Sequence, residues 1–131
     1  MAAYWGAQLL GGLVGAGLAS LLSLEAPALG TPKAASGGAF LAEVLGTFLL
    51  VLVILVAVHQ RLAWGGVAIG LVVTMAALAF GALSGASINP ARWLAPALLS
   101  GRLEEAWIYL LAPLVGGALA AWVHGLLLRA R

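Results

Sequence analysis

The sequence contains no cysteine and few charged residues. Its 131 residues include six Lys or Arg, four Asp or Glu and two His, so that charged side chains make up 8%. A soluble domain has about 25%, and ten charges cannot cover a soluble globule of this length. The absence of cysteine excludes disulfides and thiolate zinc sites, and the scarcity of His and acids leads us to expect no metal or cofactor. The net charge of +2 reflects few charges rather than a basic face, so no nucleic-acid partner is expected.

Apolar side chains are abundant, at 64% of the sequence. This composition excludes disorder and makes the lipid bilayer the expected environment. A membrane-spanning helix needs about 20 mostly apolar residues, and four stretches qualify: 3–24, 39–58, 64–83 and 107–128. The sequence therefore predicts one all-α membrane domain over residues 1–131.

The first stretch, residues 3–24, has a second interpretation as a signal peptide, because small residues follow it near Glu25. However, no positive charge precedes it, and it is longer than the 7–15 apolar residues typical of such peptides. A membrane span is therefore favoured.

Basic residues near the span ends predict the orientation. Four spans place Arg61, Arg129 and Arg131 on the side of the N-terminus, and Lys33 and Arg102 on the other side. This small excess predicts that both termini are cytoplasmic, in a protein of the cell membrane.

Glycine pairs spaced by four residues are a known helix-packing signal in membranes. They occur here at Gly11 and Gly15, Gly66 and Gly70, and Gly81 and Gly85. Chance alone gives about 2.4 such pairs at this glycine content, so the pattern indicates only a closely packed bundle.

The segment between the third and fourth spans has a different character. Asn89 and Pro90 are typical of a helix N-cap and first position, which predicts a helix over 90–100 that ends at Gly101 and is interrupted or kinked at Pro96. Eleven residues extend roughly 16 Å, half of a ~30 Å hydrocarbon core. The segment is therefore predicted to be a re-entrant half-helix, although an Asn-Pro pair in an arbitrary chain more often marks a plain turn.

The residues around this pair resemble the second signature loop of the aquaporin, or major intrinsic protein, family: Gly85-Ala86-Ser87-Ile88-Asn89-Pro90-Ala91-Arg92. The resemblance covers essentially the whole chain. Residues 4–11, 42–48, 67–71 and 107–117 are similar to the third, fourth, fifth and sixth spans of that family, in order. It implies a partial aquaporin-like fold of four spans and one half-helix.

The family has six spans and two Asn-Pro-Ala loops related by an inverted repeat, whereas this chain resembles only the third span and the second repeat. We therefore expect either a truncated product, or a homo-oligomer or partner chain that supplies the first half.

The resemblance also assigns roles. Asn89, with Pro90 and Ala91, would present its amide to a permeating oxygen, and Arg92 would repel cations, the alternative being an ion pair with Glu104 or Glu105. Glu43 would accept hydrogen bonds from backbone N–H groups of the loop, the alternative being a carboxylate at the outer interface.

Gln8 is expected to bond a neighbouring helix, and Tyr109 to pack. Ala77 and Ala86 fall at two selectivity positions of the family, where they would leave a wide, weakly polar filter. Trp93 and Ala97 occupy the positions where glycerol-conducting members carry an acid and a base, so that pattern is absent.

The leading hypothesis is thus a channel, or part of one, for passive permeation of water and small neutral solutes such as glycerol. The alternative is a non-conducting membrane scaffold or an inactive channel fragment. An enzyme is not expected, because His59 and His124 have no nucleophile or carboxylate near them in sequence.

Overall fold

The computed structural model describes residues 2–22, 36–101 and 103–129. These ranges form helices without any strand: α1 (Ala2–Leu22), α2 (Ser36–His59), α3 (Gly65–Ser84), α4 (Pro90–Ser100) and α5 (Ala106–Arg129). Four of them are long and apolar enough to cross a membrane, and α4 is the short exception. The predicted fold class is therefore confirmed. Residues 23–24 of the first predicted span, and Glu25, Lys33, Arg102 and Arg131, lie outside the described residues.

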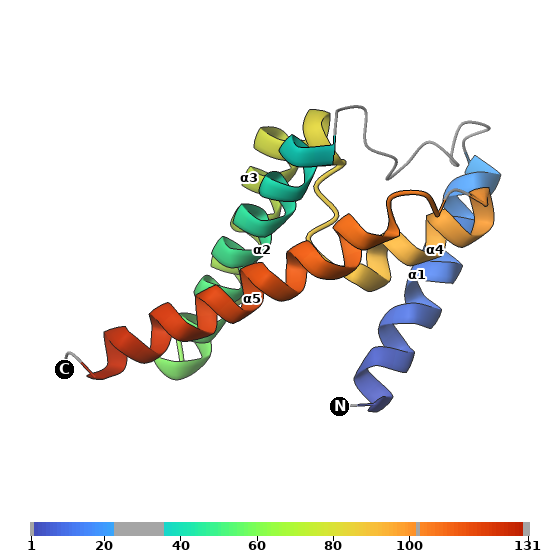
Figure 1. Ribbon diagram of the computed structural model, residues 1–131. Coiled ribbons are helices and arrows are strands. Elements are labelled where there is room, and N and C mark those ends of the chain that lie inside the picture. Colours follow the sequence, from blue (N-terminus) through green and yellow to red (C-terminus); the bar gives the residue numbers. More distant parts are fainter. Residues whose placement is uncertain (1, 23–35, 102, 130–131) are drawn as a thin grey trace.

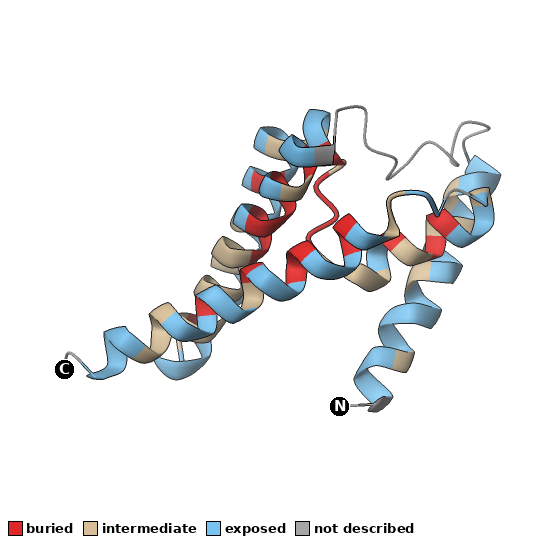
Figure 2. Ribbon diagram, in the orientation of Figure 1, coloured by how far each residue is buried: buried red, intermediate tan, exposed pale blue. Residues whose placement is uncertain are grey.

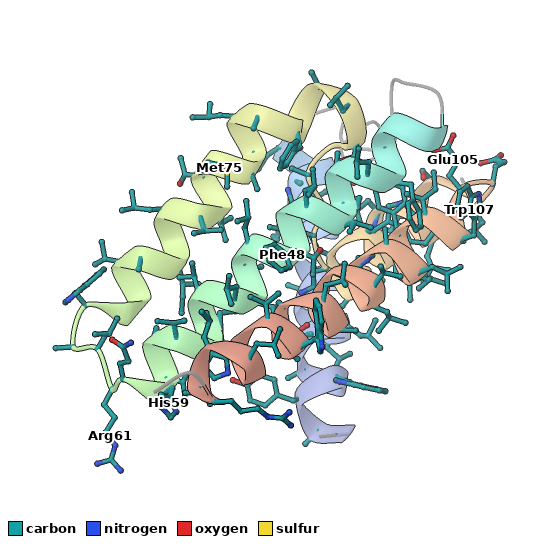
Figure 3. The ribbon with its side chains drawn as sticks, turned by 60° about the vertical axis from the view of Figure 1, so that its left-hand side comes forward. Phe48, His59, Arg61, Met75, Glu105 and Trp107 are labelled. Carbon is teal, nitrogen blue, oxygen red and sulfur yellow. The ribbon has the colours of Figure 1, made fainter. Side chains whose placement is uncertain are left out.

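The five helices form two groups, one of α2, α3 and α5 and the other of α1 and α4 (Figure 1). Helix α2 packs against both α5 and α3, whereas α1 packs against α4, and α4 also contacts the start of α5. The α2–α3 turn and the C-terminal end of α5 lie at one end of the molecule. Figure 3 shows His59 and Arg61 at this end, and Glu105 and Trp107 at the other.

Buried residues gather where α2, α5 and the segment between α3 and α4 meet (Figure 2). Most large apolar side chains instead point outward, as Leu78 on α3 does with 83% of its surface exposed. An apolar surface of this extent is stable only in contact with lipid or with further protein. The chain is an integral membrane protein.

Close helix contacts occur at Gly12 and Gly116, which do not belong to the pairs spaced by four residues. A Cβ on Gly116 of α5 would collide with the carbonyl oxygen of Val44 and lie 3.0 Å from the amide nitrogen of Phe48 on α2. A Cβ on Gly12 of α1 would lie 3.1 Å from the carbonyl oxygen of Ala91 on α4. A Cβ would meet nothing within 4 Å at five glycines of the spaced pairs, Gly11, Gly15, Gly66, Gly70 and Gly81. Glycine spacing therefore did not identify the contacts.

Helix α4 has defined ends. The side chain of Asn89 caps its first turn, Pro90 occupies the first position, and Gly101 ends it with a left-handed φ of 69°. The helix runs through Pro96, so an interruption there is wrong, and a kink at this residue stays a prediction. Proline removes one backbone donor from a helix, and this short helix is held by its caps and by packing on both sides.

Candidate functional site: the loop before the half-helix

Residues 85–89 connect α3 to α4 in an unusual backbone conformation. Gly85, Ala86 and Ile88 all have positive φ values, of 78°, 46° and 46°. Positive φ is rare outside glycine, and for a β-branched residue such as Ile88 it is a clear outlier. Such conformations persist only where the surroundings hold them.

Glu43 of α2 holds this loop from inside the bundle. Its Oε1 accepts hydrogen bonds from the Ser87 N–H at 2.8 Å and the Ser84 hydroxyl at 2.6 Å, and its Oε2 accepts one from the Ile88 N–H at 2.5 Å. Glu43 is fully buried, unlike the interfacial carboxylate that was its alternative. An ionised carboxylate is an acceptor only, with room for several donors, so one side chain satisfies two backbone groups that no helix can pair.

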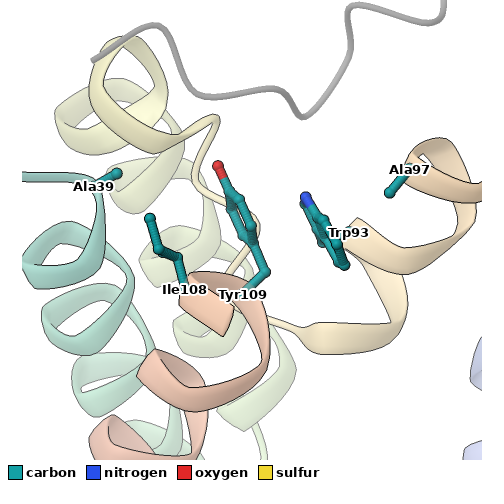
Figure 4. Close-up of a cluster of buried hydrophobic side chains, with 5 residues drawn as sticks. All are labelled: Ala39, Trp93, Ala97, Ile108 and Tyr109. Carbon is teal, nitrogen blue, oxygen red and sulfur yellow. The ribbon is translucent and has the colours of Figure 1, made fainter. Parts of the chain in front are cut away.

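Ser84 and Tyr109 extend this network. The Ser84 hydroxyl accepts a hydrogen bond from the Ala86 N–H at 3.1 Å, and the Tyr109 hydroxyl donates to the Ser84 carbonyl at 2.7 Å. The Tyr109 ring also stacks on Trp93 of α4, with centroids 5.0 Å apart and ring planes 6° from parallel (Figure 4). Tyr109 thus packs in the buried cluster, as predicted, and also joins α5 to the end of α3.

Arg92, on the first turn of α4, turns back toward its own loop. Its Nη1 donates hydrogen bonds to the carbonyl oxygens of Ala86 and Ser87. Within the described ranges no ion pair joins it to Glu104 or Glu105. The residue is exposed on the surface of this chain, and its remaining donors have no partner among the residues that the structure describes.

Asn89 is fixed at both ends of its amide. Its Oδ1 accepts from the Ala91 N–H at 2.9 Å, and its Nδ2 donates to Gln8 Oε1 on α1 at 3.1 Å. Gln8 therefore bonds the half-helix, as the sequence predicts. Because Nδ2 carries two hydrogens, one donor of Asn89 has no partner among the described residues.

The structure brings Ala86, Asn89, Pro90, Ala91 and Arg92 together on one loop and helix turn. Ala86 is buried, and its carbonyl group, more than its methyl group, takes part in the site. Ala77 lies apart, on the exposed side of α3.

Two residues of this network were not predicted as site residues. For Ser84, the sequence gives a weak indication of this role, because a hydroxyl residue beside a turn glycine often bonds nearby backbone groups. For Tyr109 it gives none, because its bond to the Ser84 carbonyl spans 25 residues and depends on the packing of α5.

The whole site falls within the part of the chain that matches a known family. Residues 1–124 match the model of the major intrinsic protein family. The chain belongs to this family. The resemblance carried by the Asn-Pro-Ala segment is therefore confirmed for nearly the whole chain.

Named members of the major intrinsic protein family are similar to it over most of its length. Nodulin-26 of Glycine max is 41% identical over 130 residues, which cover 95% of this chain and 48% of nodulin-26. Aquaporin-8 of Mus musculus is 39% identical, over 96% of this chain and 51% of its own length. Glycerol uptake facilitator protein-like 6 of Lactiplantibacillus plantarum is 38% identical, over 88% and 59%. The chain spans about half the length of the curated relatives it matches.

Proposed function

We propose that this chain forms one wall of a transmembrane channel for passive permeation of water and small neutral solutes. One observation carries the proposal: Asn89 and Arg92 sit at the N-terminus of a half-helix whose preceding loop is held from the buried side by Glu43, and both keep further donors on the open side. The relatives named as aquaporins and as a glycerol uptake facilitator support the same class of permeant.

The proposed mechanism follows from these donors. The free N–H of Asn89 binds the oxygen of a passing water or polyol. The N-terminal end of α4 carries a partial positive charge, which orients that oxygen and opposes cations and protons. Arg92 adds a full positive charge near the same point. This arrangement favours neutral hydrogen-bonding molecules.

The proposed filter is permissive. The side chains of Ala77 and Ala86 are only methyl groups, so neither side chain narrows the pore or offers a hydrogen bond to a solute. We infer that glycerol or urea passes as well as water, and that Ala77→His lowers glycerol flux more than water flux. Glycerol exclusion by the unsubstituted pore, measured by stopped-flow light scattering, would contradict this.

A pore also needs a second wall. The open side of Asn89 and Arg92 would otherwise face lipid, where an unsatisfied polar group costs several kcal/mol. We infer that a further segment of the polypeptide, a partner chain or a second copy supplies this wall, in a cell membrane with both termini cytoplasmic. Liposomes holding only the 131-residue chain should be no more permeable to water than empty ones. Fast water flux from the purified chain would instead favour two copies in opposite orientations.

The central test replaces Arg92 with Val in the chain reconstituted with a first-half segment from a relative. Proton and sodium leak should rise while water flux persists. Arg61→Val, in the exposed α2–α3 turn, is the matched control and should leave the leak unchanged. If Arg92→Val and Asn89→Ala both leave every flux unchanged, the chain is a non-conducting scaffold.

A further inference from the structure

The two histidines of the sequence meet in space. His59 is the last residue of α2 and His124 lies near the end of α5, 65 positions later, yet their ring centroids are 5.6 Å apart at an interplanar angle of 79°. The proposed pore uses neither residue. The contact between the two histidines shares no residue with the Asn89 site, which lies away from this end of the bundle.

The separation suits a shared metal ion. A zinc ion bound by two imidazoles has Zn–N bonds of about 2.0–2.1 Å, and at a tetrahedral angle this places the two ring centroids about 5.2 Å apart. The χ2 torsion of histidine is broad, so each ring can turn without a change of the backbone, and the proposal requires that one nitrogen of each ring turns toward a common point. His59 is exposed and His124 is half-buried, so an ion can enter from solvent and keep water ligands.

The helix ends near the two histidines favour a cation, whereas two nearby arginines oppose it. His59 ends α2, and His124 is near the end of α5, so the partial negative ends of two helices converge on the pair and favour a cation. Arg61 and Arg129 are the charged residues nearby in sequence. Figure 3 shows Arg61 extending away from the bundle, and Arg129 lies more than one turn beyond His124. Neither competes as a ligand, because guanidinium groups do not bind metals.

We propose that His59 and His124 form a two-imidazole site for a divalent transition-metal ion of the zinc and copper class, which ties the end of α2 to the end of α5. Imidazole ligands select these ions over magnesium and calcium. The remaining coordination positions are filled by water. Binding stabilises the folded chain, because the unfolded chain holds the two histidines far apart.

The test uses the full chain in detergent micelles, purified without a histidine tag and stripped with EDTA. Calorimetric titration with Zn²⁺ should show one ion per chain, and Zn²⁺ should raise the midpoint of thermal unfolding. His59→Gln and His124→Gln should each weaken binding roughly tenfold or more and abolish the rise, whereas Gln60→Ala, at the exposed neighbouring position, should change neither. With Cu²⁺ as the probe, electron paramagnetic resonance should show coupling to two nitrogens in the unsubstituted chain and one in each variant.

Three results would overturn the proposal. The first is binding that both His variants retain. The second is one zinc per two chains with metal-dependent dimerisation, which would place the ligands on different molecules. The third is absence of saturable binding in the unsubstituted, folded chain.

Discussion

The loop before α4 has two sides that differ in burial and in the number of contacts. On the side of α2 and α5, Glu43, Ser84 and Tyr109 are all fully buried and bond to the loop or to each other. On the side of α1, the described residues form one hydrogen bond to the loop, between Asn89 and the exposed Gln8. The buried side therefore fixes the backbone, and the open side is left with the free donors. The backbone conformation of the loop thus depends on one side, and the donors proposed to bind a solute lie on the other.

Of the substitutions that test this difference between the two sides, Glu43→Ala should have the largest effect. The substitution leaves the buried N–H groups of Ser87 and Ile88 without an acceptor, at about 1–3 kcal/mol each, and releases the positive φ of Ile88. We expect a large fall in the thermal unfolding midpoint in detergent and loss of folded protein. Glu104→Ala, at an exposed position, is the control. Equal unfolding midpoints for the two variants would show that the carboxylate does not hold the loop.

The next test compares the helix contacts on the two sides. Gly116→Ala forces a methyl group into the backbone of α2 and should cost about 1–3 kcal/mol by overpacking. Gly117→Ala, whose added methyl would meet only Val51 Cγ2 at 3.9 Å, is the matched control and should be neutral or stabilising. Gly12→Ala on the open side should cost less, because the tightest contact there is 3.1 Å. A larger loss for Gly12→Ala than for Gly116→Ala would reverse the comparison.

A smaller loss is expected for Tyr109→Phe. The change keeps the stack on Trp93 and removes only the bond to the Ser84 carbonyl, so the cost should be about 1 kcal/mol. Tyr4→Phe, at an exposed position of α1, should have no effect on the unfolding midpoint. A neutral Tyr109→Phe would mean that the hydrogen bond to the Ser84 carbonyl does not stabilise the position of α5.

The smallest effect on stability is expected for a substitution on the open side, at Gln8. Gln8→Leu removes one exposed hydrogen bond and should change the unfolding free energy by less than about 0.5 kcal/mol. In a complete pore it should nonetheless alter water flux, because Asn89 loses the partner that orients its amide. Gln60→Leu, in the exposed α2–α3 turn, is the control for flux. A large loss of stability would place Gln8 with the structural residues.

The sequence predicts the parts of this molecule that rest on local rules. The lengths of apolar runs predicted the four long helices, and Asn89, Pro90 and Gly101 predicted the bounds of α4, because caps act within a turn. The helix is not interrupted at Pro96, because packing on both sides of α4 compensates for one lost backbone hydrogen bond. The bond from Tyr109 to Ser84, the contact of Gly116 with α2 and the meeting of the two histidines each need the tertiary arrangement. These contacts join residues far apart in the sequence, so no pattern within one segment predicts them.

The re-entrant path of residues 84–101 is the central claim, and single cysteines test it directly because the chain has none of its own. Gln60→Cys, Ala91→Cys, Ser100→Cys and Leu103→Cys would be exposed in intact vesicles to a membrane-impermeant maleimide added to one side at a time. A re-entrant path predicts labelling of Ser100→Cys and Leu103→Cys from one side, of Gln60→Cys from the other, and of Ala91→Cys from neither. Free labelling of Ala91→Cys and Ser100→Cys from the same side, or labelling of the two from opposite sides, would contradict it, since α4 would then be an external loop or a crossing segment.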